Sequence, residues 1–266
     1  MSTTTLFALS ALVALMPAAF LPFCADRRRD LMFWLVLAVA LAGPLVWVFV
    51  QFAPGWRTGL APALWVTITA TLAIFVVLAA TVGDGWRLGT LLLPYLVMLG
   101  LAATIWQNRS EQLLTPSASA AWIQLHIASS LLTYAILTVA AVAGLAAFLQ
   151  ERSLKTKQPS KLTKRLPSLA VAERLELRLL AVCAVVMAFG LLSGMAVQYF
   201  ATGTLLEFDH KTLFSLLTFA LISLLLVVRY RRGLRGRRAA RLVLLAYLLL
   251  TLAYPGVKFV TDVLLA

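Results

Sequence analysis

Residues 121–150 read AWIQLHIASSLLTYAILTVAAVAGLAAFLQ and contain no aspartate, glutamate, lysine or arginine. A helix that crosses the hydrocarbon core of a bilayer needs about 20 predominantly apolar residues. This stretch is long enough, and it carries one of the two histidines of the chain, His126. The segment therefore predicts a transmembrane helix with an ionisable group near its start.

The apolar character extends over the whole chain of 266 residues. Hydrophobic residues make up 62% of it and charged residues 12%, whereas soluble domains usually have about 45–50% and about 25%. This composition excludes a soluble globular enzyme, a disordered chain and a fibrous protein. It is typical of an integral membrane protein, because lipid tolerates apolar surface.

Eight segments are long and apolar enough to span a bilayer. They are residues 3–24, 32–52, 60–82, 88–106, 121–150, 176–201, 211–230 and 240–264. We therefore expect an all-α, polytopic membrane helix bundle that forms one integral membrane domain over residues 1–266. The first segment is too long for the apolar region of a signal peptide, and no basic residue precedes it, so it is expected to be retained.

The basic residues fall mainly on one side of this expected bundle. Nineteen of the 23 lysines and arginines lie in, or at the edges of, the loops after the first, third, fifth and seventh segments. Because cytoplasmic loops are rich in Lys and Arg, both termini are predicted to lie outside. Residues 151–175 are then a basic cytoplasmic loop beside lipid headgroups. The net charge of +13 becomes an orientation signal and gives no evidence for a nucleic-acid partner.

His126 belongs to a stripe near the outer end of the fifth segment. Four residues there are spaced i, i+4, i+7 and i+11, as on one face of an α-helix. They are Trp122, His126, Ser129 and Thr133. An ionisable residue within a membrane helix marks a candidate functional site, since it is costly without a partner. A histidine that only bonds a neighbouring helix is the alternative.

The second histidine, His210, lies where the seventh segment begins. Asp209 before it is a natural N-cap, and the two adjacent residues cannot share one helix face as a catalytic pair. The topology places His126 and His210 near the same outer leaflet on different helices. Because two imidazoles can occupy both axial positions of haem iron, the pair predicts a haem site with these histidines as iron ligands.

Other residues near this end are candidates to complete the site. Lys258 is the last residue of a further helical stripe. It is expected either to pair with a haem propionate or to extend its ammonium group to the membrane interface. The other members of that stripe are Tyr247, Thr251 and Tyr254. Small residues that permit close helix packing are Gly190, Ser193 and Gly194. Candidate aromatic walls are Trp122, Tyr134, Tyr199, Phe200, Phe208 and Phe214.

No catalytic motif accompanies these residues. The chain has no GxSxG, HExxH, P-loop or Rossmann glycine pattern. We therefore expect a binding protein without catalytic residues. Two alternatives stay open, namely a regulatory or scaffolding membrane subunit without haem transport, and a small-molecule transporter.

Three stretches resemble the cytochrome c assembly protein family, whose branches include CcsA, CcmC and HemX. They are WIQLHIASSLLTYAIL (122–137), AERLELRLL with AVCAVVMAFGLLSGMA (172–196), and the run from FDHKTLF to LLAY (208–247). The resemblance covers residues 64–264 and is closest to the small HemX/YpjD-type branch. It implies a multi-pass protein of a bacterial inner membrane that handles haem, as haem b, at an outward-facing site between the fifth and seventh helices. It also implies a partner from cytochrome c assembly or another membrane protein.

The family's functional residues carry over only in part. His126 matches the external haem-ligating histidine, and Asp209 matches the aspartate of the tryptophan-rich loop. Here that loop is TGTLLEFDH at 202–210 and has no tryptophan. The second external histidine of larger members is absent, and His210 is the candidate to replace it. The resemblance thus implies a haem-binding or haem-transport protein rather than a full synthetase, with Trp122 and Lys258 as further cofactor-binding candidates.

Overall fold

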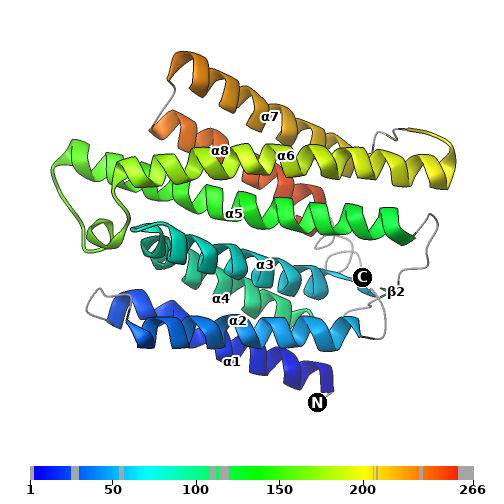
Figure 1. Ribbon diagram of the computed structural model, residues 1–266, viewed down its shortest axis with the longest axis horizontal. Helices are drawn as coiled ribbons and strands as arrows, with labels where there is room; N and C mark the ends of the chain where they lie inside the picture. The colour runs from blue at the N-terminus through cyan, green and yellow to red at the C-terminus, as the bar shows by residue number, and fades with distance from the viewer. Residues whose placement is uncertain are drawn as a thin grey trace. The chain divides into compact units, whose positions relative to one another are not determined.

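Eight α-helices make up most of the described chain (Figure 1). The computed structural model describes residues 3–24, 30–53, 57–107, 112–113, 120–205, 207, 209–233 and 236–256. The chain divides into two compact units. Unit 1 contains Met1–Leu114, Ser160–Pro167 and Thr261–Ala266, and unit 2 contains Thr115–Pro159 and Ser168–Val260.

Unit 1 contains the first four helices. They are α1 (Thr3–Cys24), α2 (Leu31–Phe52), α3 (Leu60–Thr81) and α4 (Gly89–Ile105). Its short elements are the 3₁₀ turns Gly85–Leu88 and Thr163–Arg165 and the antiparallel strands β1 (Arg57–Thr58) and β2 (Gln112–Leu113). The two-residue ladder joins the segment before α3 to the segment after α4.

Close helix approach and large aromatic side chains form the core of unit 1. Trp47 of α2 and Trp65 of α3 are almost fully buried, and their ring centroids lie 5.6 Å apart. At Gly43, an added Cβ would lie 2.6 Å from the Cβ of Ala14. Small residues allow helices in lipid to approach closely and gain dispersion energy, so Gly43 permits the packing of α1 against α2.

Unit 2 contains two long helices and a helical hairpin. The elements are α5 (Ala120–Thr156), α6 (Leu169–Thr202), α7 (His210–Arg232) and α8 (Arg237–Thr251), followed by one π-helical turn at Leu252–Gly256. Helix α5 packs along α6, α7 contacts α6, and α8 contacts α5 and α7. Figure 1 shows α5 and α6 running antiparallel over most of their length.

The all-α fold expected from the sequence is confirmed, and the helices extend further than the apolar segments. Helix α5 continues to Thr156 and α6 begins at Leu169, so both ends of the stretch expected as a loop, 151–175, are helical. Charged residues lower the hydropathy of these turns without interrupting the helix. Within the described residues, seven helices are long and apolar enough to span a membrane, and α8, with 15 residues, is not among them. The eighth span and the outward termini remain predictions.

Hydrogen bonds between side-chain hydroxyls join α5 to α8. The Tyr134 Oη atom lies 3.3 Å from Tyr247 Oη and 3.1 Å from Thr251 Oγ1. The Thr251 hydroxyl donates to the Tyr247 carbonyl at 2.8 Å. Tyr134 therefore donates to Thr251 and accepts from Tyr247, because the Thr251 hydrogen is already used. Each hydroxyl donates once, which satisfies three polar groups in an apolar environment.

This arrangement predicts that Tyr134→Phe destabilises the protein more than Tyr247→Phe. The first change removes two of the bonds described above and leaves the Tyr247 hydroxyl without this acceptor, whereas the second removes one of them. We expect losses of about 1–2 and about 0.5–1 kcal/mol. Unfolding in mixed detergent micelles measures both, and an equal or reversed order would contradict the assigned donor directions.

Candidate functional site

His126 of α5 lies against small residues of α6. Its Nδ1 atom is 3.0 Å from the carbonyl oxygen of Gly190 and 3.4 Å from Oγ of Ser193. The Ser193 hydroxyl donates to the same Gly190 carbonyl at 3.0 Å. Since a carbonyl only accepts and the Ser193 hydrogen is already used, Nδ1 carries the hydrogen and donates it.

This hydrogen bond decides which ring nitrogen is available to a ligand. In a neutral imidazole with its hydrogen on Nδ1, the lone pair lies on Nε2. Within the described part of the chain, no residue hydrogen-bonds Nε2 of His126. Metal-ligating histidines commonly donate their other ring N–H to a backbone carbonyl or a carboxylate. The contact with Gly190 therefore prepares His126 to ligate through Nε2.

Gly194 provides the space that the ring occupies. An added Cβ at Gly194 would lie 2.9 Å from Cε1 and 3.1 Å from Nδ1 of His126. One turn earlier, a Cβ at Gly190 would lie 3.4 Å from Oγ of Ser129, which is ordinary contact. Gly190, Ser193 and Gly194, which were predicted to permit close helix packing, thus also hold the imidazole.

The stripe predicted on α5 is present, but its members differ in exposure. Ser129 and Thr133 are buried, and their hydroxyls donate to the carbonyls of His126 and Ser129 in their own helix. His126 is half-buried, whereas the side chain of Trp122 is 39% exposed. The three inner members therefore face the interior of unit 2, and Trp122 is left accessible to a ligand or lipid.

Asp209 caps α7 as the sequence predicts. Its Oδ1 atom accepts a hydrogen bond from the Thr212 N–H at 2.8 Å, and His210 follows as an exposed first helical residue. Partial burial alone would raise the pKa of Asp209, but hydrogen bonds from Thr212 and the nearby Lys211 and His210 outweigh it and lower the pKa. The charged form of Asp209 is therefore favoured at neutral pH.

We expect Asp209→Ala to loosen the first turn of α7 by about 0.5–1 kcal/mol, because the cap is exposed. Since folding lowers the pKa, the stabilisation is present above the ordinary value of 3.8 and is lost as the pH falls through the lowered value. Hydrogen exchange at the amides of residues 211–213 should be faster in the variant at pH 7. Unchanged exchange there would contradict this role.

A short connection between α6 and α7 positions His210. Gln198 donates to Oε2 of Glu207 at 2.8 Å and to the Thr202 hydroxyl at 3.2 Å. The N–H of Asp209 in turn donates to the Glu207 carbonyl at 2.9 Å. Helix α6 is capped by Gly203, whose φ of 75° suits glycine. These bonds tie the start of α7 to the last turns of α6.

His126 and His210 are not joined by any interaction among the described residues. Figure 1 shows the start of α5, the end of α6 and the start of α7 at one end of unit 2. No group of three His, Cys, Asp or Glu suited to a metal ion is found in the described ranges. Paired axial ligation therefore stays a prediction. Lys258 lies outside the described residues, as do the side chains of Phe208 and Tyr254.

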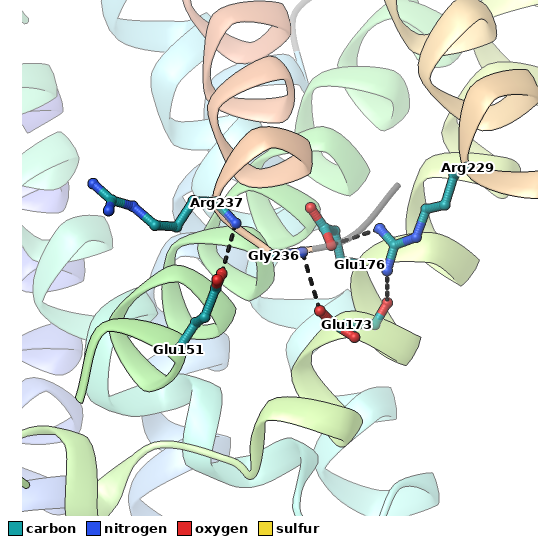
Figure 2. A network of polar contacts seen from close by, with 6 residues as sticks. All are labelled: Glu151, Glu173, Glu176, Arg229, Gly236 and Arg237. Carbon is teal, nitrogen blue, oxygen red and sulfur yellow. Dashed lines mark hydrogen bonds and ion pairs between the residues drawn. The ribbon is translucent and has the colours of Figure 1, made fainter. Parts of the chain in front are cut away.

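A buried ion pair that the sequence did not predict lies at the opposite end of unit 2 (Figure 2). Arg229 Nη1 lies 2.7 Å from Glu176 Oε2, and these side chains are only 5% and 2% exposed. Arg229 Nη2 also donates to the Glu173 carbonyl at 2.8 Å. The available signal was the i, i+3 spacing of Glu173 and Glu176 in an apolar helix, which suits two acceptors on one face.

Comparison with known proteins identifies the family. The family model described as "Cytochrome C assembly protein" matches residues 5–265. The Azospirillum brasilense protein named "Uncharacterized 28.8 kDa protein in nifR3-like 5'region" is 51% identical over 271 residues, which is 100% of each chain. The "Cytochrome c biogenesis protein CcsA" of Chlamydomonas reinhardtii is 24% identical over 178 residues, which cover 66% of this chain and 49% of that protein.

These matches confirm the resemblance found in the sequence motifs and extend it beyond residues 64–264. The family model spans nearly the whole chain, and the apolar helices agree with a membrane protein. The chain is therefore a membrane protein that belongs to the cytochrome c assembly protein family.

Proposed function

We propose that this protein binds haem at an outward-facing site in unit 2, with His126 as an iron ligand. The observation that carries the proposal is the hydrogen bond from His126 Nδ1 to the Gly190 carbonyl, at 3.0 Å. It leaves Nε2 with a lone pair and no described hydrogen-bond partner. A carbonyl acceptor on the remote nitrogen also raises the basicity of the ligating nitrogen.

Exposed aromatic side chains lie at the same end of α5 and α6 as His126. They are Trp122 of α5 and Tyr199 and Phe200 of α6, and the last two rings form an edge contact with centroids 5.9 Å apart. When bound, haem supplies the iron that an imidazole ligates. The chain supplies the oriented ring of His126 and a second candidate imidazole at His210.

The wider role follows from the family and the charge distribution. Membership in the cytochrome c assembly family supports haem b as the ligand and an assembly protein as a partner. The excess of basic residues at the other ends of the helices supports an outward orientation of His126 in a bacterial inner membrane. We infer a protein that holds or passes on haem without catalysing its attachment.

Haem titration of the purified protein in detergent tests the proposal. We expect a b-type Soret band, a loss of affinity of more than about 100-fold in His126→Ala, and a smaller loss in His210→Ala. Added imidazole should restore the spectrum of His126→Gly, which separates loss of the ligand from loss of the fold. Equal haem affinity of the wild type and His126→Ala would overturn the assignment.

A further inference from the structure

The acidic side chains near the start of α8 make contacts inside unit 2 (Figure 2). Glu176 pairs with Arg229, Glu173 Oε1 accepts the Gly236 N–H at 3.1 Å, and Glu151 Oε2 accepts the Arg237 N–H at 2.7 Å. Glu151 also pairs with Lys155. These three carboxylates are therefore held in place by backbone or buried groups.

The contacts of Glu151 and Glu173 have a clear local cause. Helix α8 begins after Gly236, which has no side chain to accept the first N–H groups of the helix. Instead, the first N–H groups of α8 are capped by Glu151, which belongs to α5, and by Glu173, which belongs to α6. At Gly236, where φ is 67°, an added Cβ would overlap with the Glu151 carboxylate. Because these carboxylates already accept hydrogen bonds from the start of α8, they do not pair with the exposed arginines described nearby.

The exposed face of α8 and of the first residue of the π-helical turn after it combines arginines at its start with leucines further along. The exposed residues at i, i+3, i+7, i+10 and i+14 are Arg238, Arg241, Leu245, Leu248 and Leu252. The buried residues of the helix are Ala239, Ala240, Val243 and Ala246. Within the described chain, no acidic side chain forms an ion pair with the two arginines. We name the exposed set the Arg238–Leu252 stripe.

The dimensions of this stripe match one leaflet of a bilayer. Arg241 and Leu252 are separated by 11 residues, or about 16 Å at 1.5 Å per residue. Half of the hydrocarbon core is about 15 Å thick. A ligand that covers the stripe must therefore have an anionic head and an apolar part about as long as one leaflet is thick.

Exposed basic residues followed by exposed apolar residues also occur on α6, and on α7 the order along the chain is reversed. On α6 the exposed residues are Arg174 and Arg178, then Val185, Phe189 and Leu192. On α7 they are Leu217, Leu224 and Val227, then Arg231. Figure 1 shows that α6 and α8 begin, and α7 ends, at one end of unit 2. The basic residues of the three helices therefore lie at a common end.

We propose that the Arg238–Leu252 stripe binds an anionic phospholipid of the phosphatidylglycerol type. Guanidinium groups bind phosphate oxygens through paired hydrogen bonds. Arg238 and Arg241 therefore bind the headgroup phosphate. The acyl chains lie along Leu245, Leu248 and Leu252. A soluble acidic protein would match the arginines but not the exposed leucines that follow them on the same face.

Native mass spectrometry of the full chain in detergent tests this proposal without reference to haem. Phosphatidylglycerol and phosphatidylcholine with identical acyl chains are added at equal concentrations, and the retained lipids are counted. The wild type should prefer phosphatidylglycerol, and Arg238→Gln/Arg241→Gln should reduce this preference by about 30-fold, since each basic group near an anionic lipid contributes about five-fold.

Two control variants make the result specific. Arg238→Lys/Arg241→Lys should show a preference between those of the wild type and the double glutamine variant, because the charges remain but the paired guanidinium–phosphate hydrogen bonds are lost. Lys211→Gln, an exposed change at the other end of α7, should leave it unchanged. Thermal melting of each variant confirms that the fold is retained. Equal retention of the two lipids by the wild type, or an undiminished preference in the double glutamine variant, would overturn the proposal.

Discussion

Replacing Gly194 with alanine should weaken haem binding by about 10- to 100-fold, the usual cost of disturbing a hydrogen bond that orients a ligating histidine. The added Cβ would lie 2.9 Å from Cε1 of His126, so the imidazole must move away from α6. That movement breaks the 3.0 Å contact between Nδ1 and the Gly190 carbonyl. The ring then loses its fixed tautomer and its orientation.

Gly190→Ala is the matched control for this prediction. Its Cβ would meet only Ser129, at 3.4 Å from Oγ, and both substitutions add the same methyl group to the same helix. Alanine favours a helix over glycine by about 1 kcal/mol, so neither variant should lose α6. Soret titrations should show weakened binding in Gly194→Ala and nearly unchanged binding in Gly190→Ala. Equal affinities would refute the role assigned to the His126 ring position.

Arg229→Met should be the most destabilising single change at the ion pair, with a loss of about 3–5 kcal/mol in the free energy of unfolding. The substitution removes the partner of a Glu176 carboxylate that is 2% exposed. Among the described residues, the other carboxylate oxygen, Oε1, has no hydrogen-bond partner and lies close to Gly144. In Arg229→Met, no described residue would therefore compensate the buried negative charge of Glu176.

The double variant Glu176→Met/Arg229→Met should regain most of this loss, because removing both charges also removes their cost of burial. Arg231→Met is the surface control, since Arg231 is exposed two residues further along, and it should change stability by less than about 0.5 kcal/mol. Unfolding in mixed micelles gives all three values. A single variant as stable as the double variant would contradict a buried, paired Arg229.

The sequence predicts the helices well because a bilayer imposes a length of about 20 apolar residues on each span. Helices α2 and α3 begin and end within one residue of the expected segments. Helices α5 and α6 run on past their apolar parts. The extra turns carry Glu151 and Glu173, and Glu176 is the first residue of the expected sixth segment. Contacts with α7 and α8 compensate these charges, which a hydropathy scale counts only as unfavourable.

Predictions about the site succeed where helix periodicity is the relevant property. The spacing of His126, Ser129 and Thr133 predicts an inward face, and Ser129 and Thr133 are buried as expected. Asp209 caps α7 because capping needs only neighbouring residues. Exposure of Trp122 at the start of the same stripe was not predictable, because the end of a helix need not be covered by its neighbour.

By itself, the sequence determines a helical membrane protein, the inward stripe of α5 and the capped start of α7, because these depend on local composition and spacing. Only the tertiary structure shows that His126 donates to Gly190, 64 residues away, and that Arg229 is paired with Glu176, 53 residues away. Successive helical residues are rotated by about 100°. A small change in the rotation of α6 against its neighbours would therefore give both side chains different partners.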